Sequence, residues 1–198
     1  MESEKRWPKA VVKVGGSLFD LPDLGPRLLK WLAERPAGEV LLVPGGGPAA
    51  DVVREYDRVH ALGEEHAHWL ALSALTLNAQ FLASLLPGAV VVPHVQPFAT
   101  DRLQGKIPVL DPYAFARADE GQPESLPHCW TITSDSLAAR AARIAGAREL
   151  ILLKSVSLPA GMDWTEAAKR GLVDAYFTHV AGSFLPIRFI NFRHWPAM

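Results

Sequence analysis

Two glycine-rich stretches decide the fold of this chain: VVKVGGS at residues 11–17 and LLVPGGGP at residues 41–48. Each is a short apolar run that ends in consecutive glycines. Short apolar runs bounded by glycine or proline are typical of buried strands in a parallel sheet that is covered on both faces. Residues 26–35, which lie between the two stretches, have leucines at helical spacing. Together the three segments predict a β-α-β unit.

The rest of the chain continues this alternation of apolar runs and helical patterns. We expect further strands at residues 89–92, 107–110, 150–153 and 189–192, and helices at residues 49–60, 64–86 and 134–147 and from residue 165. No internal repeat or linker divides the sequence, so we expect one α/β domain over residues 1–198. The stretch at residues 64–86 is hydrophobic nearly all round, as in core helices or subunit contacts, and we therefore expect a homodimer.

Composition narrows the classes of partner. The net charge of −1 over 198 residues provides no basic excess for nucleic acid or an anionic membrane. A single cysteine, Cys129, excludes an intramolecular disulfide and a cysteine cluster for zinc. Residues 1–9 lack the apolar core of a secretory signal, and no apolar run approaches the ~20 residues that span a bilayer. We expect a cytoplasmic protein that binds a small molecule, without membrane or nucleic acid.

The first glycine stretch has the features of a phosphate site. Gly15 and Gly16 let backbone N–H groups approach an anion without interference from a Cβ atom, and Ser17 follows them. Lys13 precedes them on the strand, where its ammonium group could offset charge during phosphoryl transfer. The alternative is an ordinary tight turn with Lys13 in solvent, although a strand of valines is expected to be buried on both faces. The pattern alone leaves both interpretations open.

The second glycine stretch predicts an anion-binding concavity. Gly45, Gly46 and Gly47 end a strand and precede a helix whose N-terminus points at them. The alternative is a flexible loop, but flexibility there costs conformational entropy. Neither glycine stretch matches the P-loop or the dinucleotide fingerprint. Because the carboxyl ends of parallel strands share one sheet edge, the two glycine turns should meet, and this pairing is the informative signal.

Two later stretches supply charged candidates. In TITSDSLAARAA at residues 131–142, Ser134 and Asp135 start a helix, where they either cap its first N–H groups or, for Asp135, accept hydrogen bonds from lysines. In LILLKSVS at residues 150–157, Lys154 emerges at the carboxyl end of a strand, where open α/β sheets bind ligands. Lys154 is either a second phosphate-binding lysine or a solvated charge.

Candidates for the acceptor side follow the second glycine stretch. Arg54 and Arg58 lie four positions apart on one helix face, where they either bind an anionic acceptor or form a solvated face with nearby acids. His66 and His68 fall on different faces of a helix, which disfavours a shared metal, and we assign His66 to the acceptor pocket. Asp101 and Lys106 flank a short loop and are weaker candidates.

Taken in order over residues 9–156, these segments resemble the amino acid kinase superfamily, which includes acetylglutamate, aspartate, uridylate and isopentenyl phosphate kinases. The resemblance implies a three-layer α/β/α sandwich with a mostly parallel central sheet, ATP at the carboxyl ends of the strands, and Mg²⁺ bridging the nucleotide phosphates. Catalysis is then expected from Lys13, Asp135 and Lys154. Nucleotide contacts are expected from Lys13, Gly15, Gly16, Ser17, Ser134, Asp135, Lys154 and Ser155. Acceptor contacts are expected from Gly45, Gly46, Gly47, Arg54, Arg58 and His66.

Within that superfamily the chain is similar to short archaeal-type members such as the kinase that acts on aminomethylfuran-methanol phosphate in methanofuran biosynthesis. Residues 52–72, 105–112 and 129–142 carry this likeness. The implied reaction is transfer of the ATP γ-phosphoryl group to a phosphate monoester or a carboxylate, in a methanofuran- or tetrahydromethanopterin-linked one-carbon pathway.

One departure from the superfamily pattern supports a different function. Many relatives continue the fifth strand into an acidic turn toward the nucleotide base, whereas residues 155–159 read SVSLP and contain no acid. The stretch beyond is also short. The alternative is therefore a non-catalytic ligand-binding or storage paralogue that keeps the fold.

Overall fold

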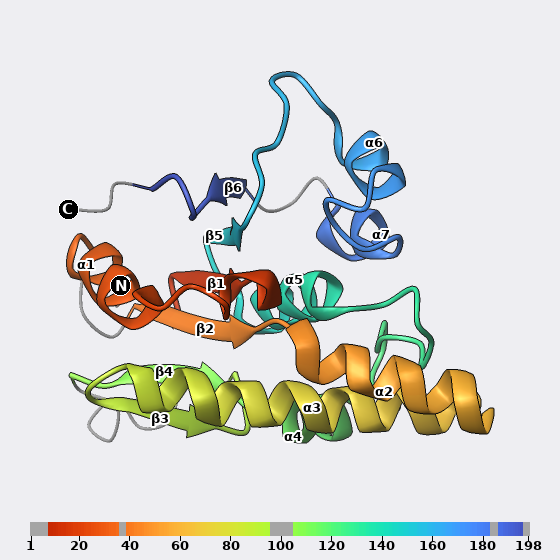
Figure 1. Ribbon diagram of the computed structural model, residues 1–198. Coiled ribbons are helices and arrows are strands. Elements are labelled where there is room, and N and C mark those ends of the chain that lie inside the picture. The colour runs from red at the N-terminus through yellow and green to blue at the C-terminus, as the bar shows by residue number, and fades with distance from the viewer. Residues whose placement is uncertain (1–7, 36–38, 96–104, 183–185, 196–198) are drawn as a thin grey trace, which may run out of the picture.

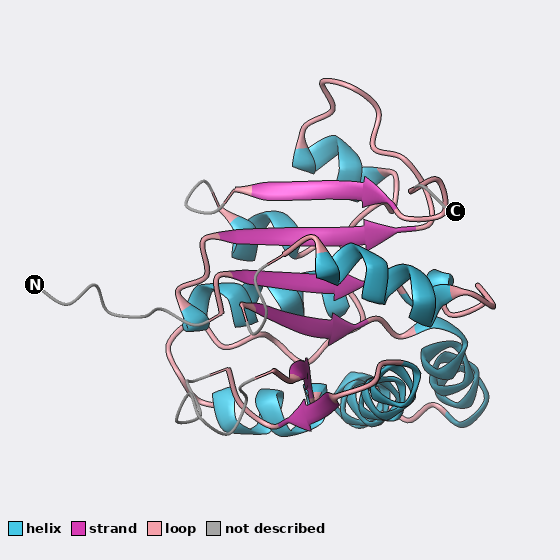
Figure 2. Cartoon of the chain, turned by 90° about the vertical axis from the view of Figure 1, so that its left-hand side faces the viewer, coloured by secondary structure: helices cyan, strands magenta, loops and turns pink. Residues whose placement is uncertain are grey.

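A six-stranded parallel sheet organises the part of the chain that the computed structural model describes, residues 8–35, 39–95, 105–182 and 186–195. Its strand order is β3-β4-β2-β1-β5-β6, and every neighbouring pair is parallel. Figure 2 shows the central strands side by side and pointing the same way. The strands are β1 (Ala10–Val14), β2 (Val40–Pro44), β3 (Ala89–Val92), β4 (Ile107–Leu110), β5 (Glu149–Lys154) and β6 (Ile187–Asn191). The prediction of a mostly parallel sheet is confirmed.

Helices cover both faces of the sheet, which confirms the three-layer α/β/α sandwich (Figure 1). Alternate residues of β1 point to opposite faces: Val11 packs in the core beneath α5, whereas Val12 and Val14 pack in the core beneath α1 and α3. The longer helices are α1 (Leu24–Ala33), α2 (Gly47–His60), α3 (Glu64–Leu85) and α5 (Ser134–Ala145). The shorter ones are η1 (Gly16–Leu18), α4 (Pro112–Asp119), α6 (Trp164–Lys169) and α7 (Phe177–Ala181).

Besides η1, the two short helices α4 and α7 were not predicted from the sequence. In α4, Pro112 occupies the first turn and the Asp111 side chain accepts hydrogen bonds from the N–H groups of Tyr113 and Ala114, so the helix has a clear start signal. In α7, which has five residues, the chain is too short for a helical period to appear. The predicted helix at residues 134–147 ends earlier, at Ala145, because Gly146 adopts a left-handed conformation with φ 62°.

Helix α3 connects the sheet to the glycine turns. Its residues Ala79 and Leu82 are buried in the core beneath α1, and its other end runs beside α2 (Figure 1). The side chains of Leu70, Leu77 and Phe81 remain exposed on it. Within the described residues, no helix has the length and apolar character needed to cross a membrane.

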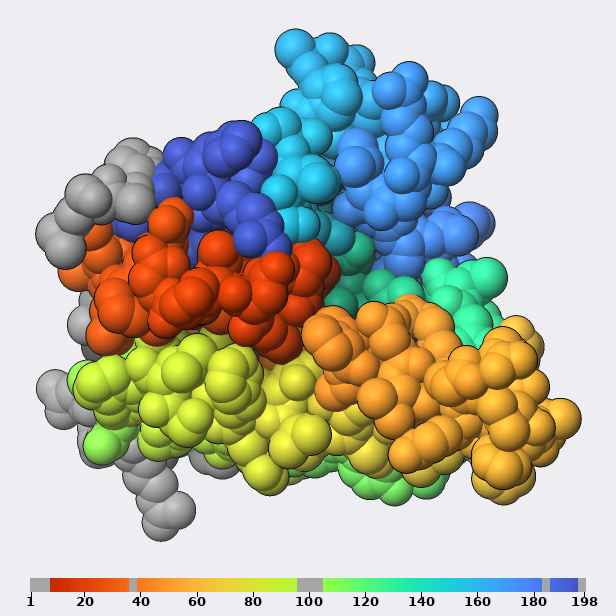
Figure 3. All heavy atoms as spheres, viewed as in Figure 1, coloured from red at the N-terminus to blue at the C-terminus, as the bar shows by residue number. Residues whose placement is uncertain are grey.

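The carboxyl ends of the central strands converge on one side of the molecule. In the space-filling view, α2 and the segment that carries α6 and α7 stand on either side of this edge, with the segment before α5 between them (Figure 3). Helices α5 and α7 pack against each other, so the last quarter of the chain reaches the helix that carries Asp135.

Candidate active site

The two lysines expected to bind phosphate point to the same face of the sheet. Lys13 is paired in register with Leu152 of β5, and Lys154 follows two residues later. Because side chains alternate along a strand, Lys154 and Leu152 share a face with Lys13, which is the face covered by α5. The Lys13 residue is 5% exposed, so the interpretation of a solvated lysine does not apply.

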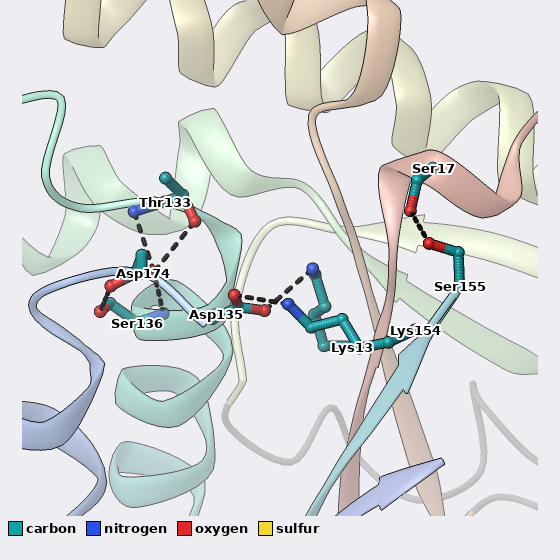
Figure 4. A network of polar contacts seen from close by, with 8 residues as sticks. All are labelled: Lys13, Ser17, Thr133, Asp135, Ser136, Lys154, Ser155 and Asp174. Carbon is teal, nitrogen blue, oxygen red and sulfur yellow. Dashed lines mark hydrogen bonds and ion pairs between the residues drawn. The ribbon is translucent and has the colours of Figure 1, made fainter. Parts of the chain in front are cut away.

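Asp135 on α5 faces both ammonium groups from the same side (Figure 4). Its Oδ1 forms an ion pair with Lys13 Nζ at 2.9 Å, outside hydrogen-bonding geometry, and its Oδ2 accepts a hydrogen bond from Lys154 Nζ at 2.7 Å. Burial acts to raise the pKa of the Asp135 carboxyl, but the charges of Lys13 and Lys154 outweigh burial and hold the pKa below its ordinary value. Two cations therefore share one anion, and the cluster carries a net positive charge.

The electrostatic environment of Lys154 lowers its pKa. Burial, followed by the charge of Lys13, lowers the pKa of Lys154 from its ordinary value to about 8, although Asp135 opposes this change. An anion placed beside Lys154 would relieve the repulsion between the ammonium groups. The cluster is thus arranged to receive negative charge.

The two glycine turns lie in direct backbone contact. A Cβ atom on Gly16 would stand 2.1 Å from the nitrogen of Gly47, and one on Gly45 would stand 2.3 Å from the nitrogen of Gly16. Gly47 also has a φ of +51°, which favours glycine. Asn78 of α3, buried beneath the turn, donates hydrogen bonds to the carbonyl oxygens of Gly45 and Gly46 at 2.8 and 2.6 Å. The structure therefore brings the two turns together, and Asn78 is a supporting residue that the sequence did not reveal.

The start of α5 is held from a distant part of the chain. Capping by Ser134 and Asp135 was one of the two interpretations of this helix start, but the structure places Thr133 at the N-cap position, and its side chain makes no cap hydrogen bond. Instead Asp174, between α6 and α7, accepts hydrogen bonds from both Thr133 and Ser136 (Figure 4). The cap is therefore not local, because the carboxylate that accepts from Thr133 lies 41 positions away.

A cavity of about 260 Å³ opens beside the lysine cluster. Its charged and glycine-lined end contains Lys13, Gly16, Ser17, Gly46, Gly47, Ser134, Asp135 and Lys154. The remaining wall, between α2, α3 and α5, is mostly apolar or aromatic and includes Ala50, Ala71, Leu72, Leu75, Cys129, Trp130, Ile132 and Leu137. A ligand with an anionic end and a compact apolar body fits this division.

The acceptor candidates are separated by the structure. Arg54 lines the cavity, pairs with Asp51 at 2.6 Å and lies over the Trp130 ring. Arg58 is not among the lining residues; it is largely exposed and pairs with Glu55.

The structure places the two histidines differently. His66 is exposed and lies outside the cavity lining, whereas His68 is buried and lines the cavity. The His68 ring stacks on His128, which contacts Glu65 at 2.7 Å. Burial and the charge of His128 lower the pKa of His68 to about 4, so the imidazole is neutral near pH 7. Of the two weaker candidates, Lys106 is exposed, and Asp101 lies outside the described residues.

The first glycine turn also makes polar contacts with the residues that follow β5 and β6. The hydroxyl groups of Ser17 and Ser155 share one hydrogen bond of 2.8 Å, and Gly15 packs against the β5 backbone. Arg193 donates to the carbonyl oxygen of Ser17 at 2.7 Å and to the carboxylate of Asp20. The acid-free turn at residues 155–159 is therefore hydrogen-bonded to the first glycine turn through Ser155.

Comparisons with known proteins place these features in context. A sequence profile of the amino acid kinase family matches residues 8–157. A curated protein of Methanocaldococcus jannaschii, [5-(aminomethyl)furan-3-yl]methyl phosphate kinase, is 29% identical over 149 residues, and the match spans 74% of this chain but only 65% of that protein.

Solved structures share the fold. The uridylate kinase of Archaeoglobus fulgidus superposes with a TM-score of 0.64 at 20% identity, over 92% of this chain and 90% of that one. The UMP kinase of Bacillus anthracis gives 0.62 at 15% identity, over 96% and 89%. The aspartate kinase of Synechocystis gives 0.62 at 14% identity, over 91% of this chain and 38% of that one.

Proposed function

This chain belongs to the amino acid kinase family, and on that premise we propose that it transfers the γ-phosphoryl group of ATP to a small-molecule acceptor. The observation that carries the proposal is the cluster of Lys13, Asp135 and Lys154 beside two touching glycine turns. The acid-free turn at residues 155–159 raised the alternative of a non-catalytic paralogue, but no other feature of the described residues favours it over a kinase with these groups in place.

The protein groups act by positioning and by neutralising charge. The transferring group needs little covalent chemistry from a kinase, because catalysis depends mainly on alignment and electrostatic stabilisation. Lys13 and Lys154 supply two ammonium groups, and Asp135 holds both at the same point. Glycine N–H groups and the N-terminus of α5 add donors to the same end of the cavity. Mg²⁺ bound to the nucleotide phosphates would neutralise part of their charge, as in other kinase sites where the substrate phosphates bind the ion.

For the acceptor, we propose a phosphate monoester with a small ring, of the kind named for the Methanocaldococcus jannaschii relative. The apolar wall of the cavity suits such a ring, and Arg54 suits its phosphate. The products are then ADP and a diphosphate monoester. This reaction belongs in methanofuran biosynthesis, within one-carbon cofactor metabolism.

Two further proposals concern the state of the enzyme. A homodimer is supported by the exposed apolar side chains of Leu70, Leu77 and Phe81 on α3. Light scattering after gel filtration measures the molar mass and so tests this oligomeric state. The single cysteine and the use of ATP support a cytoplasmic enzyme. The one sheet that spans the described residues supports a single domain.

A direct assay tests the function. The protein is incubated with Mg·ATP and [5-(aminomethyl)furan-3-yl]methyl phosphate, and the diphosphate product is followed by ³¹P NMR. We expect turnover in the wild type, a loss of at least about 100-fold in Lys13→Met, and near-normal turnover in Lys9→Met. Lys9 is a suitable control because it lies near the same strand but pairs with Glu39 away from the cavity.

The outcomes separate the function from its acceptor. Binding of Mg·ATP by calorimetry without turnover would contradict the proposed acceptor. Absence of binding at millimolar Mg·ATP would favour the non-catalytic alternative.

A further inference from the structure

Asp174 makes an unusual set of contacts at the start of α5. Its Oδ2 accepts hydrogen bonds from the backbone N–H of Thr133 at 3.1 Å, the Thr133 hydroxyl at 2.9 Å and the backbone N–H of Ser136 at 2.9 Å. Its Oδ1 accepts a fourth from the Ser136 hydroxyl. All four donors belong to the residues that bracket Ser134 and Asp135. One carboxylate therefore fixes the first turn of α5 on both sides of the residue that pairs with the lysines.

These contacts replace a local cap. A serine or threonine at the N-cap normally accepts a hydrogen bond from an N–H group two or three residues later. Here the Thr133 hydroxyl donates to Asp174 instead, and Asp174 accepts from the N–H that the cap would have satisfied. Hydrogen bonds to a carboxylate are stronger than those to a neutral hydroxyl. The position of this helix start thus depends on a residue outside the helix.

Asp174 is itself held firmly. Its neighbour Val173 and the first residue of α7, Phe177, are 3% and 0% exposed and pack in the same core as α5. The N–H of Phe177 also donates to the Asp174 carbonyl oxygen at 3.2 Å. The Asp174 carboxylate therefore ties the start of α5 to a tightly packed part of the core.

The position of Asp135 requires such support. Its two oxygens contact Lys13 and Lys154 on neighbouring strands at 2.9 and 2.7 Å, so a shift of α5 along its axis would lengthen both contacts. Asp174 contacts neither lysine and is not itself a lining residue of the cavity, although it bonds to Thr133, which is. It also lies beyond residues 8–157, which carry the family match.

We infer that Asp174 is a positioning residue, which holds Asp135 in register with Lys13 and Lys154 by fixing the first turn of α5. The inference rests on the proposed kinase function for its effect on turnover, but not for its effect on the lysine cluster. The C-terminal segment with α6 and α7 thereby supports the active site in addition to the core.

The test compares three variants with a matched control. Asp174→Ala removes all four hydrogen bonds, Asp174→Asn keeps the shape but loses the charge, and Ser136→Ala removes one bond from the opposite side. The control is Asp163→Ala. Asp163 caps α6 by accepting from the Glu166 N–H at 2.8 Å, but it is exposed and remote from the cavity lining.

Two readouts are measured on each folded variant, after thermal unfolding has confirmed the fold. The first is the pKa of Lys154, obtained from the pH dependence of its acetylation by acetic anhydride, with peptide mass spectrometry to identify the site. The second is kcat with Mg·ATP and [5-(aminomethyl)furan-3-yl]methyl phosphate. Because the Asp135 charge acts to raise the pKa of Lys154, displacement of Asp135 should lower that pKa further below about 8.

We expect Asp174→Ala to lower both the pKa of Lys154 and kcat, the latter by about 10- to 100-fold, with little change in KM for ATP. Asp174→Asn and Ser136→Ala should show smaller changes in the same direction, and Asp163→Ala should lose stability without either change. Unchanged titration of Lys154 in folded Asp174→Asn and Ser136→Ala would overturn the inference. If the wild type shows no turnover, the proposed function fails, whereas the Lys154 titration still decides the role of Asp174.

Discussion

Gly16 and Gly47 touch backbone to backbone, although they belong to turns that follow different strands. A Cβ atom on Gly16 would lie 2.1 Å from the Gly47 nitrogen, far inside van der Waals contact. The contact aligns two sets of backbone N–H groups at the carboxyl ends of β1 and β2, beside the lysine cluster. We propose that the two turns act together as one phosphate cradle.

Gly16→Ala should separate the two glycine turns. We expect Mg·ATP binding, measured by calorimetry, to weaken by at least about tenfold, which corresponds to about 1.4 kcal/mol. The control is Gly121→Ala, where φ is +76° but no atom lies within 4 Å of the added Cβ. That variant should lose about 1–2 kcal/mol of stability from backbone strain and keep its ATP affinity. Equal ATP affinities in the two variants would contradict the cradle.

Arg54 and Arg58 on α2 allow a comparison of two variants that tests where the acceptor binds. Arg54→Ala should raise KM for the phosphate-monoester acceptor by about tenfold or more, because a charge-assisted contact contributes about 1.5–3 kcal/mol. Arg58→Ala should behave as the wild type, since this side chain is outside the cavity lining. Steady-state kinetics with varied acceptor measure both. A larger effect from Arg58→Ala would place the acceptor elsewhere.

Lys154 should make activity fall at alkaline pH. Its pKa is lowered to about 8, and the protonated form is the one that attracts phosphate, so kcat/KM for ATP should decrease as pH rises above about 8. Bound phosphate stabilises the ammonium group, and the decrease in kcat should therefore occur at higher pH. Lys154→Arg keeps its charge over this range and should lose the decrease in kcat/KM. A profile that is flat to pH 10 in the wild type would argue against a role for this ammonium group.

His68 should reduce the free energy of unfolding at acid pH. Its pKa is about 4 in the folded protein and about 6.5 when unfolded, so the unfolded state binds more protons between these values. The free energy of unfolding therefore falls as pH decreases from about 6.5 to 4. His68→Gln should reduce this slope in denaturant titrations. His66→Gln, which removes an exposed imidazole from the same helix, is the control, and an equal reduction there would contradict the prediction.

Local sequence patterns were sufficient for much of the sheet. The valine and leucine runs predicted the strands because parallel strands are buried on both faces, and consecutive glycines marked the carboxyl ends of β1 and β2. The pattern could not decide between His66 and His68. Helix α3 is hydrophobic nearly all round, so its sequence does not show which side faces the cavity, and only its packing beside α2 and the sheet places His68 inward.

By itself, the sequence determined the α/β class, the two glycine turns and the family, because these depend on short-range periodicity and on residue types at fixed spacing. Only the tertiary structure showed that Asn78 supports the second glycine turn and that Asp174 fixes the start of α5. Both are hydrogen bonds between residues more than 30 positions apart. Such contacts depend on how whole elements pack, which no local pattern records.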